Sequence, residues 1–390
     1  MQPFPLYRAA GSHRELGRQH GEQAREKVVA HVDYIGATMK LSRAQLRERA
    51  LLHRLLFAEH APHLLEEIVG LAEGADIDLA DALAANIRGA LQQLPGLGAS
   101  AGGCTSFAVS GRGTAGGRVL AGQNSDMLPA ASEFSYILNL QPEGKPEVMM
   151  YTFGGMIGYH GLNSAGVAHF ANDLGGGGPV PRFGLSHYPL KRLMLECQTM
   201  AQVLKLFDRL PLWANGNYVV ADGSGAILDV EATADGPFPL ADDGSDFIAH
   251  ANHYVCAEHD TPENRALCAP DSYVRHQRMA ELIGARFGQI TVDDCKAFLR
   301  DRDNDPSGIC RQAQTGDPAA DWQTAGITVA SIIADPAAGE LHVAAGNAAD
   351  APAATGAPAT QAPAPATQAP APEAPAAGND GGNDDGGNDD

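Results

Sequence analysis

Cys104, which follows the glycine pair Gly102-Gly103, carries the strongest chemical signal in the sequence. The bond between Gly103 and Cys104 can rearrange when the thiol attacks the preceding carbonyl, because glycine has no Cβ and tolerates a strained turn. After this rearrangement and hydrolysis of the resulting thioester, Cys104 would carry a free α-amino group, whose reference pKa of roughly 7.7–8.0 lets it accept the thiol proton. The sequence therefore predicts a self-cleaving chain in which Cys104 becomes an N-terminal nucleophile with its own base.

This chemistry also needs an acid that orients the amine and donors for the oxyanion. Asp126 ends the strand-like run after Cys104, and a hairpin would return it to the cysteine. Side-chain amides are natural oxyanion donors, and Asn172 and Asn252 each stand at an expected strand end. Arg275 and Arg278 could bind a substrate carboxylate, although simple pairing with nearby acids is the favoured interpretation.

Other interpretations of these residues stay open. His250, His253, Cys256 and His259 recur every three residues, a pattern that suggests a metal site. That spacing needs a helix, whereas the segment has the character of a strand end and loop, so we expect no metal and no cofactor. A chemically inert buried thiol, a cysteine enzyme with a separate histidine base, a metal-dependent amidase and an unprocessed binding protein are the remaining alternatives.

The predicted secondary structure that must position these residues changes at Cys104, from helices to strands. Before it, the pattern predicts helices over His13–Met39, Arg43 to about Glu59, Pro62 to about Gly74, and Asp78 to about Leu91. After it, we expect strands over Thr105–Ser110, Arg118–Gln123, Tyr136–Leu140, Val148–Phe153, Gly166–Ala171, Tyr218–Ala221, Ala226–Glu231, Ile327–Ala334 and Glu340–Ala345. Further helices are expected at Leu190–Cys197, after the Thr199 cap, after an Asp271 cap and after a Thr291 cap. Hairpins beside helix pairs predict stacked sheets covered by helices.

The amino-acid composition limits the classes of partner that the protein is expected to bind. The 390 residues have a net charge of −20, and seven acids lie from Asp350 onward, which leaves −13 for the rest. No basic cluster indicates a nucleic-acid surface. No apolar run is long enough to cross a bilayer or resembles a signal peptide, so we expect no membrane partner and a cytoplasmic location. The six scattered cysteines, without a CxxC pair, indicate neither a disulfide framework nor a zinc site.

The C-terminal segment 349–390 consists of Ala- and Pro-rich repeats that end in Gly-Asn-Asp units. This composition cannot bury a core, so it predicts a disordered acidic tail.

Several motifs, taken in order, resemble the penicillin acyltransferase family, also called peptidase family C45. Cys104-Thr105-Ser106 is the first, followed by the expected turn over 122–126 and by Gly161-Leu162-Asn163-Ser164-Ala165-Gly166-Val167. The others are Leu16 to Gly21, Asn217 to Asp222 with Glu231, Ala251-Asn252-His253, Ser307 to Arg311 and Thr328 to Ile333. The resemblance covers about residues 5–347.

That resemblance implies an α+β, four-layer αββα N-terminal-nucleophile hydrolase fold, with two stacked antiparallel sheets flanked by helices. It implies a precursor cut into a small chain, 1–103, and a catalytic chain, 104–348, which stay associated; a higher oligomer is left open. Carried over, Cys104 is the nucleophile, Asp126 its orienting partner and Asn252 the oxyanion donor, and Asn172 and Glu231 are further candidates.

The activity that the resemblance implies is cleavage or transfer of the acyl group of a small N-acyl amide. Hydrolysis is favoured because water is always available to resolve an acyl-enzyme, and acyl-CoA-dependent transfer is the alternative. Glu231, Arg275 and Arg278 are candidate substrate contacts. Ser125 stands where relatives often carry an aromatic residue, so the substrate pocket is expected to differ.

Overall fold

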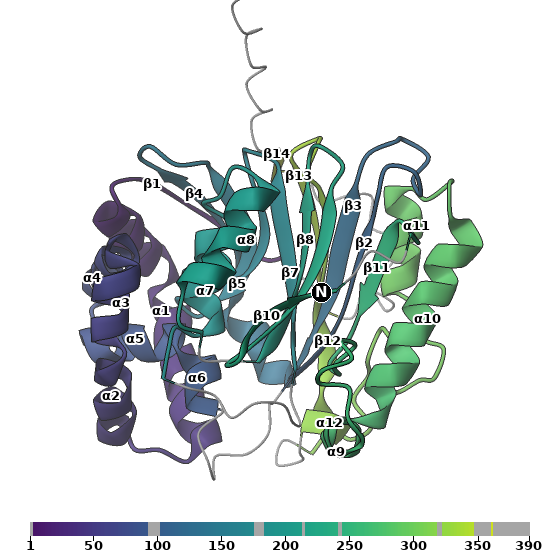
Figure 1. Ribbon diagram of the computed structural model, residues 1–390. Helices are drawn as coiled ribbons and strands as arrows, with labels where there is room; N and C mark the ends of the chain where they lie inside the picture. Colours follow the sequence, from purple (N-terminus) through teal and green to yellow (C-terminus); the bar gives the residue numbers. More distant parts are fainter. Residues whose placement is uncertain are drawn as a thin grey trace, which may run out of the picture.

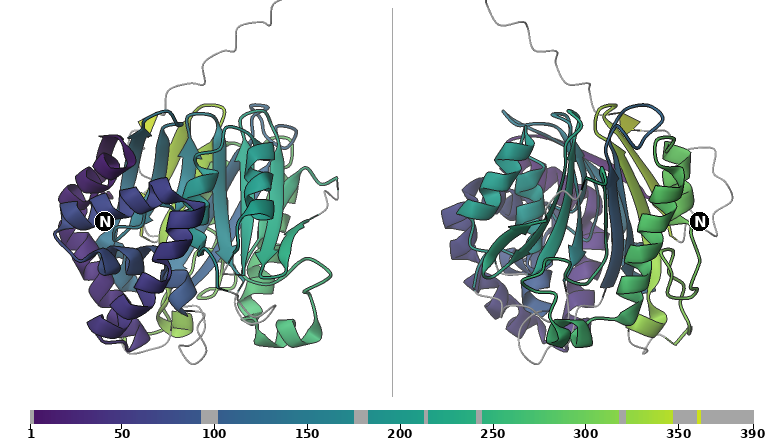
Figure 2. Two further views of the ribbon diagram at one scale, coloured as in Figure 1. Left: turned by 60° about the vertical axis from the view of Figure 1, so that its left-hand side comes forward. Right: turned by 45° about the vertical axis from the view of Figure 1, so that its right-hand side comes forward.

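Two β-sheets lie face to face at the centre of the molecule, and helices cover both outer faces (Figures 1 and 2). The computed structural model describes residues 3–92, 102–174, 183–212, 215–240, 244–317, 322–346 and 360–361. The right-hand view of Figure 2 shows the order helix, sheet, sheet, helix. The expected four-layer αββα fold is confirmed.

The first sheet has eight strands in the order β1-β4-β5-β6-β7-β8-β9-β10. Its strands are β1 (Leu6–Gly11), β4 (Ser135–Pro142), β5 (Val148–Phe153), β6 (His160–Asn163), β7 (Val167–Asp173), β8 (Gly216–Asp222), β9 (Ile227–Thr233) and β10 (Gly236–Pro239). All neighbours pair antiparallel except β1, which runs parallel to β4. The sequence did not indicate β1, so the expectation of purely antiparallel sheets was wrong at this edge.

The second sheet has six strands in the order β11-β2-β3-β12-β13-β14, all antiparallel. Its strands are β11 (Phe247–His250), β2 (Gly102–Val109), β3 (Leu120–Met127), β12 (Ile327–Asp335), β13 (Glu340–Ala345) and β14 (Thr360–Gln361). The nucleophile candidate therefore lies on β2, one strand in from the edge. Of the expected tail, Thr360 and Gln361 pair with β13, and the rest lies outside the described residues.

One helical layer packs on the eight-stranded sheet. It contains α1 (His13–Met39), α2 (Arg43–Leu52), α3 (Arg54–His60), α4 (Pro62–Ala75), α5 (Leu79–Asn86), α6 (Arg88–Gln92), α7 (His187–Met194) and α8 (Met200–Arg209). Apolar residues of α1 and α4 share a core with β4 and β5, and those of α7 and α8 share one with β7, β8 and β9. This layer therefore joins residues from both sides of Cys104.

The other helical layer covers β2, β3 and β12. It consists mainly of α10 (Pro270–Arg286) and α11 (Val292–Leu299), whose Met279, Ile283 and Phe298 pack on Phe107 and Leu120. The short elements α9 (Pro262–Leu267), α12 (Trp322–Ala325) and the 3₁₀ helix η1 (Pro129–Phe134) complete the described fold. None of the described helices is long and apolar enough to span a membrane. The cytoplasmic location stays a prediction.

Helices α1 and α4 approach so closely that glycine is required between them. A Cβ built on Gly17 would lie 1.8 Å from the Glu67 carbonyl oxygen, and one on Gly74 would lie 2.0 Å from that of Arg18. The packing therefore depends on the absence of side chains at these positions.

Local expectations failed at four points. The helix expected from Arg43 to Glu59 divides at His53, and the one expected to reach Leu91 ends at Asn86. Helix α10 is capped by Ala269 with Pro270 at its first turn, so Asp271 is not its cap. Residues 122–126 form no turn but lie inside β3.

Candidate active site

The hairpin of β2 and β3 sets the position of Cys104. Cys104 lies opposite Ser125, and Gly103 lies opposite Asp126. Side chains alternate along a strand, and Ala108 of β2 and Ala121 of β3 belong to the core between the sheets. Cys104 lies an even number of residues from Ala108, and Ser125 an even number from Ala121. Both side chains therefore face the interior between the sheets. The hairpin therefore returns Asp126 to the cysteine, as the sequence predicts.

Asn252 reaches the same point from the loop that follows β11. Its Oδ1 accepts a hydrogen bond of 2.9 Å from the backbone N–H of Cys104, and its Nδ2 donates one of 2.9 Å to the carbonyl oxygen of Asp173. The Asn252 N–H donates to Ser272 Oγ at 2.7 Å. Asn252 thus holds the nitrogen that cleavage would convert into an α-amino group.

Arg275 of α10 fixes the backbone on the other side of the cysteine. Its guanidinium donates to the carbonyl oxygen of Cys104, to Thr105 Oγ1 at 2.9 Å and to Asn252 Oδ1 at 3.0 Å. It also pairs with Asp271 at 3.2 Å and is 1% exposed. These contacts make Arg275 a positioning residue, and its expected role as a substrate contact stays a prediction.

Arg278 has no such contact with Cys104. One turn further along α10, it pairs with Asp301 at 2.7 Å and lies within ion-pair distance of Glu281 and Asp303. Its side chain is 28% exposed. This is the pairing with nearby acids that the sequence favoured.

Asp126 is buried on the opposite face of β3 from Ser125. Its Oδ1 accepts a hydrogen bond from Thr328 Oγ1 at 2.7 Å, whereas Oδ2 is buried and has no hydrogen-bond partner among the described residues. Burial raises the pKa of Asp126 and outweighs the opposing charges of Arg275 and Arg311. One carboxylate oxygen is therefore available for a new donor next to Gly103.

Sequence reasoning gave no role to Arg311 or Thr328. Arg311 is 2% exposed, donates its backbone N–H to Thr328 Oγ1 at 2.9 Å and pairs with Asp271 through its guanidinium. Both residues stood inside quoted motifs, Ser307 to Arg311 and Thr328 to Ile333. The position of Arg311 at the end of such a motif was the signal that the sequence offered.

Asn172 lies on β7, across the space between the sheets from β2. Its Oδ1 accepts a hydrogen bond from Ser106 Oγ, and its Nδ2 is buried without a hydrogen-bond partner among the described residues. Ser106 follows Cys104 by two residues, so it lies on the same face of β2. The structure therefore brings Asn172 to this site with an unused donor.

The thiol of Cys104 is protonated in the intact chain. Burial raises its pKa to about 12, and the charge of Asp126 adds to the effect. A thiol in this state needs a base close by before it can attack a carbonyl. An α-amino group released on the same residue would supply that base.

Glu231 lies apart from the thiol and supports the loop that carries Asn252. It is fully buried, accepts a hydrogen bond from His250 Nε2 at 3.0 Å, and accepts backbone N–H groups of Val255 and Cys256. Its role as a substrate contact stays a prediction. The segment after β11 is no helix, so the spacing of three does not bring His250, His253, Cys256 and His259 to one helical face.

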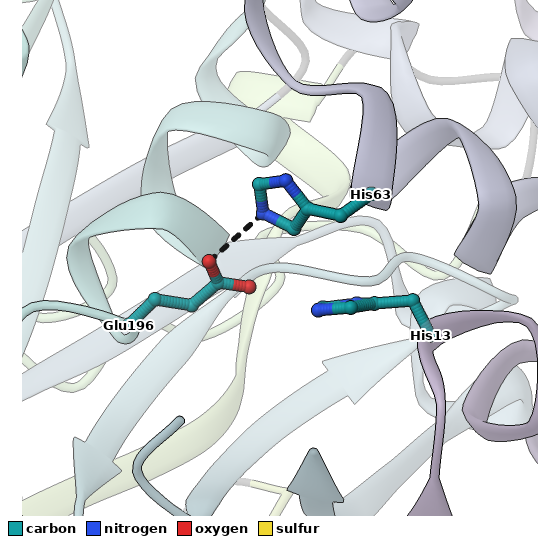
Figure 3. Close-up of side chains that lie close together, drawn as sticks. All are labelled: His13, His63 and Glu196. Atoms are coloured by element: carbon teal, nitrogen blue, oxygen red, sulfur yellow. Dashed lines mark hydrogen bonds and ion pairs between the residues drawn. The ribbon is translucent and has the colours of Figure 1, made fainter. Parts of the chain in front are cut away.

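Among the described residues, ligand atoms converge instead at His13, His63 and Glu196, all within 4.8 Å (Figure 3). His63 Nε2 lies 2.9 Å from Glu196 Oε2. Burial acts to raise the pKa of Glu196, but the charges of Arg192, His63 and Lys145 outweigh it and hold that pKa at about 2. The carboxylate is thus already neutralised by cations, which leaves little attraction for a metal ion.

The same network connects residues on either side of Cys104. Glu67 pairs with His13 at 2.8 Å and with Arg192 at 3.2 Å, and both Glu67 and Arg192 are fully buried. His13, His63 and Glu67 precede Cys104, whereas Arg192 and Glu196 follow it. The network therefore joins the two segments that cleavage at Cys104 would produce.

Two stacked sheets between helical layers form the αββα architecture of the N-terminal-nucleophile hydrolase fold. The chain belongs to the acyl-coenzyme A:6-aminopenicillanic acid acyl-transferase family, whose model matches residues 113–350. It is 28% identical over 311 residues to the acyl-coenzyme A:6-aminopenicillanic-acid-acyltransferase 40 kDa form of Emericella nidulans, covering 78% of this chain and 84% of the relative.

Solved structures with a similar fold include the Caenorhabditis elegans ortholog of N-acylethanolamine-hydrolyzing acid amidase. It has a TM-score of 0.42 and 16% identity, over 60% of this chain and 93% of that one. A mutant of the conjugated bile acid hydrolase from Clostridium perfringens gives a TM-score of 0.41 and 11% identity, over 62% of this chain and 89% of that one.

Proposed function

We propose that this protein cleaves itself between Gly103 and Cys104 and that Cys104 then removes the acyl group from small N-acyl amides. One observation carries the proposal: Asn252 Oδ1 binds the backbone nitrogen of Cys104 at 2.9 Å. A side chain from the loop after β11 would keep that nitrogen beside its own thiol after the chain is cut. Family membership supports the same chemistry.

In the processing step, the thiol of Cys104 attacks the carbonyl carbon of Gly103. The C–N bond breaks, the acyl group moves to sulfur, and the nitrogen of Cys104 takes the thiol proton and becomes an amine. Water then hydrolyses the thioester, leaving a carboxylate on Gly103 and a free thiol on Cys104. No external oxidant or cofactor is needed for this sequence.

In the catalytic step, the amine takes the thiol proton and the thiolate attacks the amide carbonyl of the substrate. The ammonium returns the proton to the leaving amine, and a thioester acyl-enzyme remains. We assign the orientation of the amine to Asp126, because its Oδ2 lacks a hydrogen-bond partner among the described residues. The amides of Asn172 and Asn252 are the donors for the oxyanion.

Water or a second amine can resolve the acyl-enzyme. We assign hydrolysis as the main reaction, because water needs no binding site of its own. Transfer from acyl-CoA to an amine is the second candidate, and the name of the Emericella nidulans relative favours it. Incubation with acyl-CoA and an amine, followed by mass spectrometry of the products, separates the two: a new N-acyl amide indicates transfer, and the free acid alone indicates hydrolysis.

The self-cleavage is tested on a denaturing gel with N-terminal sequencing. Wild type should give fragments of 1–103 and 104–390, the second beginning with Cys104. Cys104→Ala should stay intact, whereas the control Cys197→Ala, which changes a buried thiol that donates to the Leu193 carbonyl, should be cut normally. An intact wild-type chain after long incubation, or an active enzyme with an internal Cys104, rules out the proposed mechanism.

A further inference from the structure

A buried lysine that forms no ion pair among the described residues lies beside the candidate nucleophile. Lys191, in α7, is 6% exposed. Within the described part of the chain its Nζ also has no hydrogen-bond acceptor; its close neighbours are the ring faces of Tyr159, at 4.5 Å, and Tyr188, at 5.7 Å. Removing an ammonium group from water costs several kcal/mol, and cation–π contacts return only about 2 kcal/mol. Binding an anion would therefore stabilise the buried ammonium group of Lys191.

A short chain of contacts links Lys191 to Cys104. The hydroxyl of Tyr159 lies 3.3 Å from Ser125 Oγ, and Ser125 pairs directly with Cys104 across the hairpin. Side chains of directly opposed residues lie roughly 5 Å apart at Cβ. The ammonium group, Tyr159 and the thiol therefore share one environment between the sheets.

The electrostatics agree with this arrangement. Burial lowers the pKa of Lys191 to about 8, while the charges of Cys104 and Asp173 act to raise it. Reciprocally, Lys191 acts to lower the pKa of the Cys104 thiol. The two groups are close enough for each charge to act on the other.

Most polar groups around this space are neutral, and one carboxylate, that of Asp173, also acts on Lys191. Asn172 Nδ2 is a buried donor without a partner among the described residues. His160 and His169 are buried, and burial together with the charge of Lys191 lowers the pKa of both, so they stay neutral.

The covalent chemistry decides which part of a substrate reaches Lys191. The acyl group stays bonded to sulfur in the interior, whereas the leaving amine must depart toward solvent. This inference rests on the proposed function. We propose that Lys191 binds a carboxylate on the acyl group of the substrate. The preferred substrates are then amides of dicarboxylic or similar carboxylate-bearing acids. An ammonium–carboxylate pair forms a charge-assisted hydrogen bond, whereas a hydrocarbon acyl chain leaves the ammonium unpaired.

The test compares two p-nitroanilides on the processed enzyme: the glutaryl anilide and its neutral methyl ester. Wild type should prefer the carboxylate by at least about tenfold in kcat/KM, the effect of roughly 1.4 kcal/mol of differential binding. Lys191→Met removes the charge at similar length and should bring that ratio to about one. Lys296→Met changes a lysine that pairs with Asp293 on the outer helix α11 and should keep the wild-type ratio.

A second readout does not depend on turnover. Glutarate should slow alkylation of Cys104 by iodoacetamide in wild type, and this protection should be lost in Lys191→Met. A wild type that prefers the neutral ester, or a Lys191→Met variant that loses both activities equally and keeps the ratio, overturns the assignment. If processed wild type cleaves the neutral ester alone, only the role of Lys191 fails. If it cleaves no acyl anilide of any kind, the proposed function fails.

Discussion

Asn252 and Cys104 are 148 residues apart in the sequence, yet the Oδ1 of one binds the backbone N–H of the other at 2.9 Å. The two ends of the asparagine amide have different partners, because Nδ2 donates to the carbonyl of Asp173. Holding the nitrogen of Cys104 and the proposed donation to an oxyanion would therefore be separable tasks of one side chain.

Two substitutions separate these tasks. Asn252→Asp keeps an acceptor for the nitrogen of Cys104 but removes the donor, so we expect self-cleavage to continue while kcat falls by about 10²–10³-fold. Asn252→Leu removes both and should slow self-cleavage as well. Gel analysis of fragment formation and kcat of the isolated two-chain protein measure the two effects. Equal losses in the two variants would contradict the division.

Asn172 should affect catalysis without affecting processing to the same degree. Asn172→Asp keeps an acceptor for Ser106 but removes the buried donor, so we expect kcat to fall by about 100-fold while KM changes little. Ser106→Ala is the control, since it removes the contact with Asn172 but leaves the donor in place; its kcat should fall much less. A larger loss in Ser106→Ala would mean that Asn172 has a structural role only.

The two fragments should stay together because a buried ion pair joins them. In the uncut Cys104→Ala background, Glu67→Ala leaves the guanidinium of Arg192 buried without this partner, and we expect the free energy of unfolding to fall by about 3–5 kcal/mol. Urea denaturation measures it. Glu22→Ala, in the exposed pair with Arg18, should cost less than about 1 kcal/mol. Fragments of wild type that separate on gel filtration would contradict the association.

Stability should fall as the pH drops below neutral. Burial lowers the pKa of His20 from 6.5 to about 4, so the folded state resists a proton that the unfolded state accepts. The contribution of His20 to the free energy of unfolding is fully present above pH 6.5. It is lost as the pH falls toward 4, by at most about 1.4 kcal/mol per pH unit. His20→Gln should reduce the slope of the free energy of unfolding against pH over this range. An unchanged slope would contradict the assignment.

Local signals were sufficient for most of the fold. The short apolar run Val148–Phe153 located β5, and the caps at Thr199 and Thr291 located α8 and α11, because these elements follow from short-range sequence patterns. Strand β1 escaped notice because Leu6–Gly11 gains its stability from parallel pairing with β4, which no local pattern records. The break at His53 likewise depends on tertiary packing.

The residues of the site also fall into those that the sequence indicated and those that only the folded structure reveals. Cys104, Asp126 and Asn252 have side chains whose chemistry suggested their roles, and the hairpin register brings the first two together. Lys191 gave no signal, since a lysine in a short helix is ordinary until its burial is known. Arg275 was placed on the correct helix, but its bonds to the backbone of Cys104 arise from the packing of α10 on β2.

In the intact chain, Gly102 and Gly103 are part of β2 and lie opposite Met127 and Asp126. A cut before Cys104 would make these glycines the free end of the small chain, kept in the sheet by two residues of pairing. Their departure would uncover Asp126 and the new amine together. A single scission would therefore both create the base and expose it together with the carboxylate that faces it.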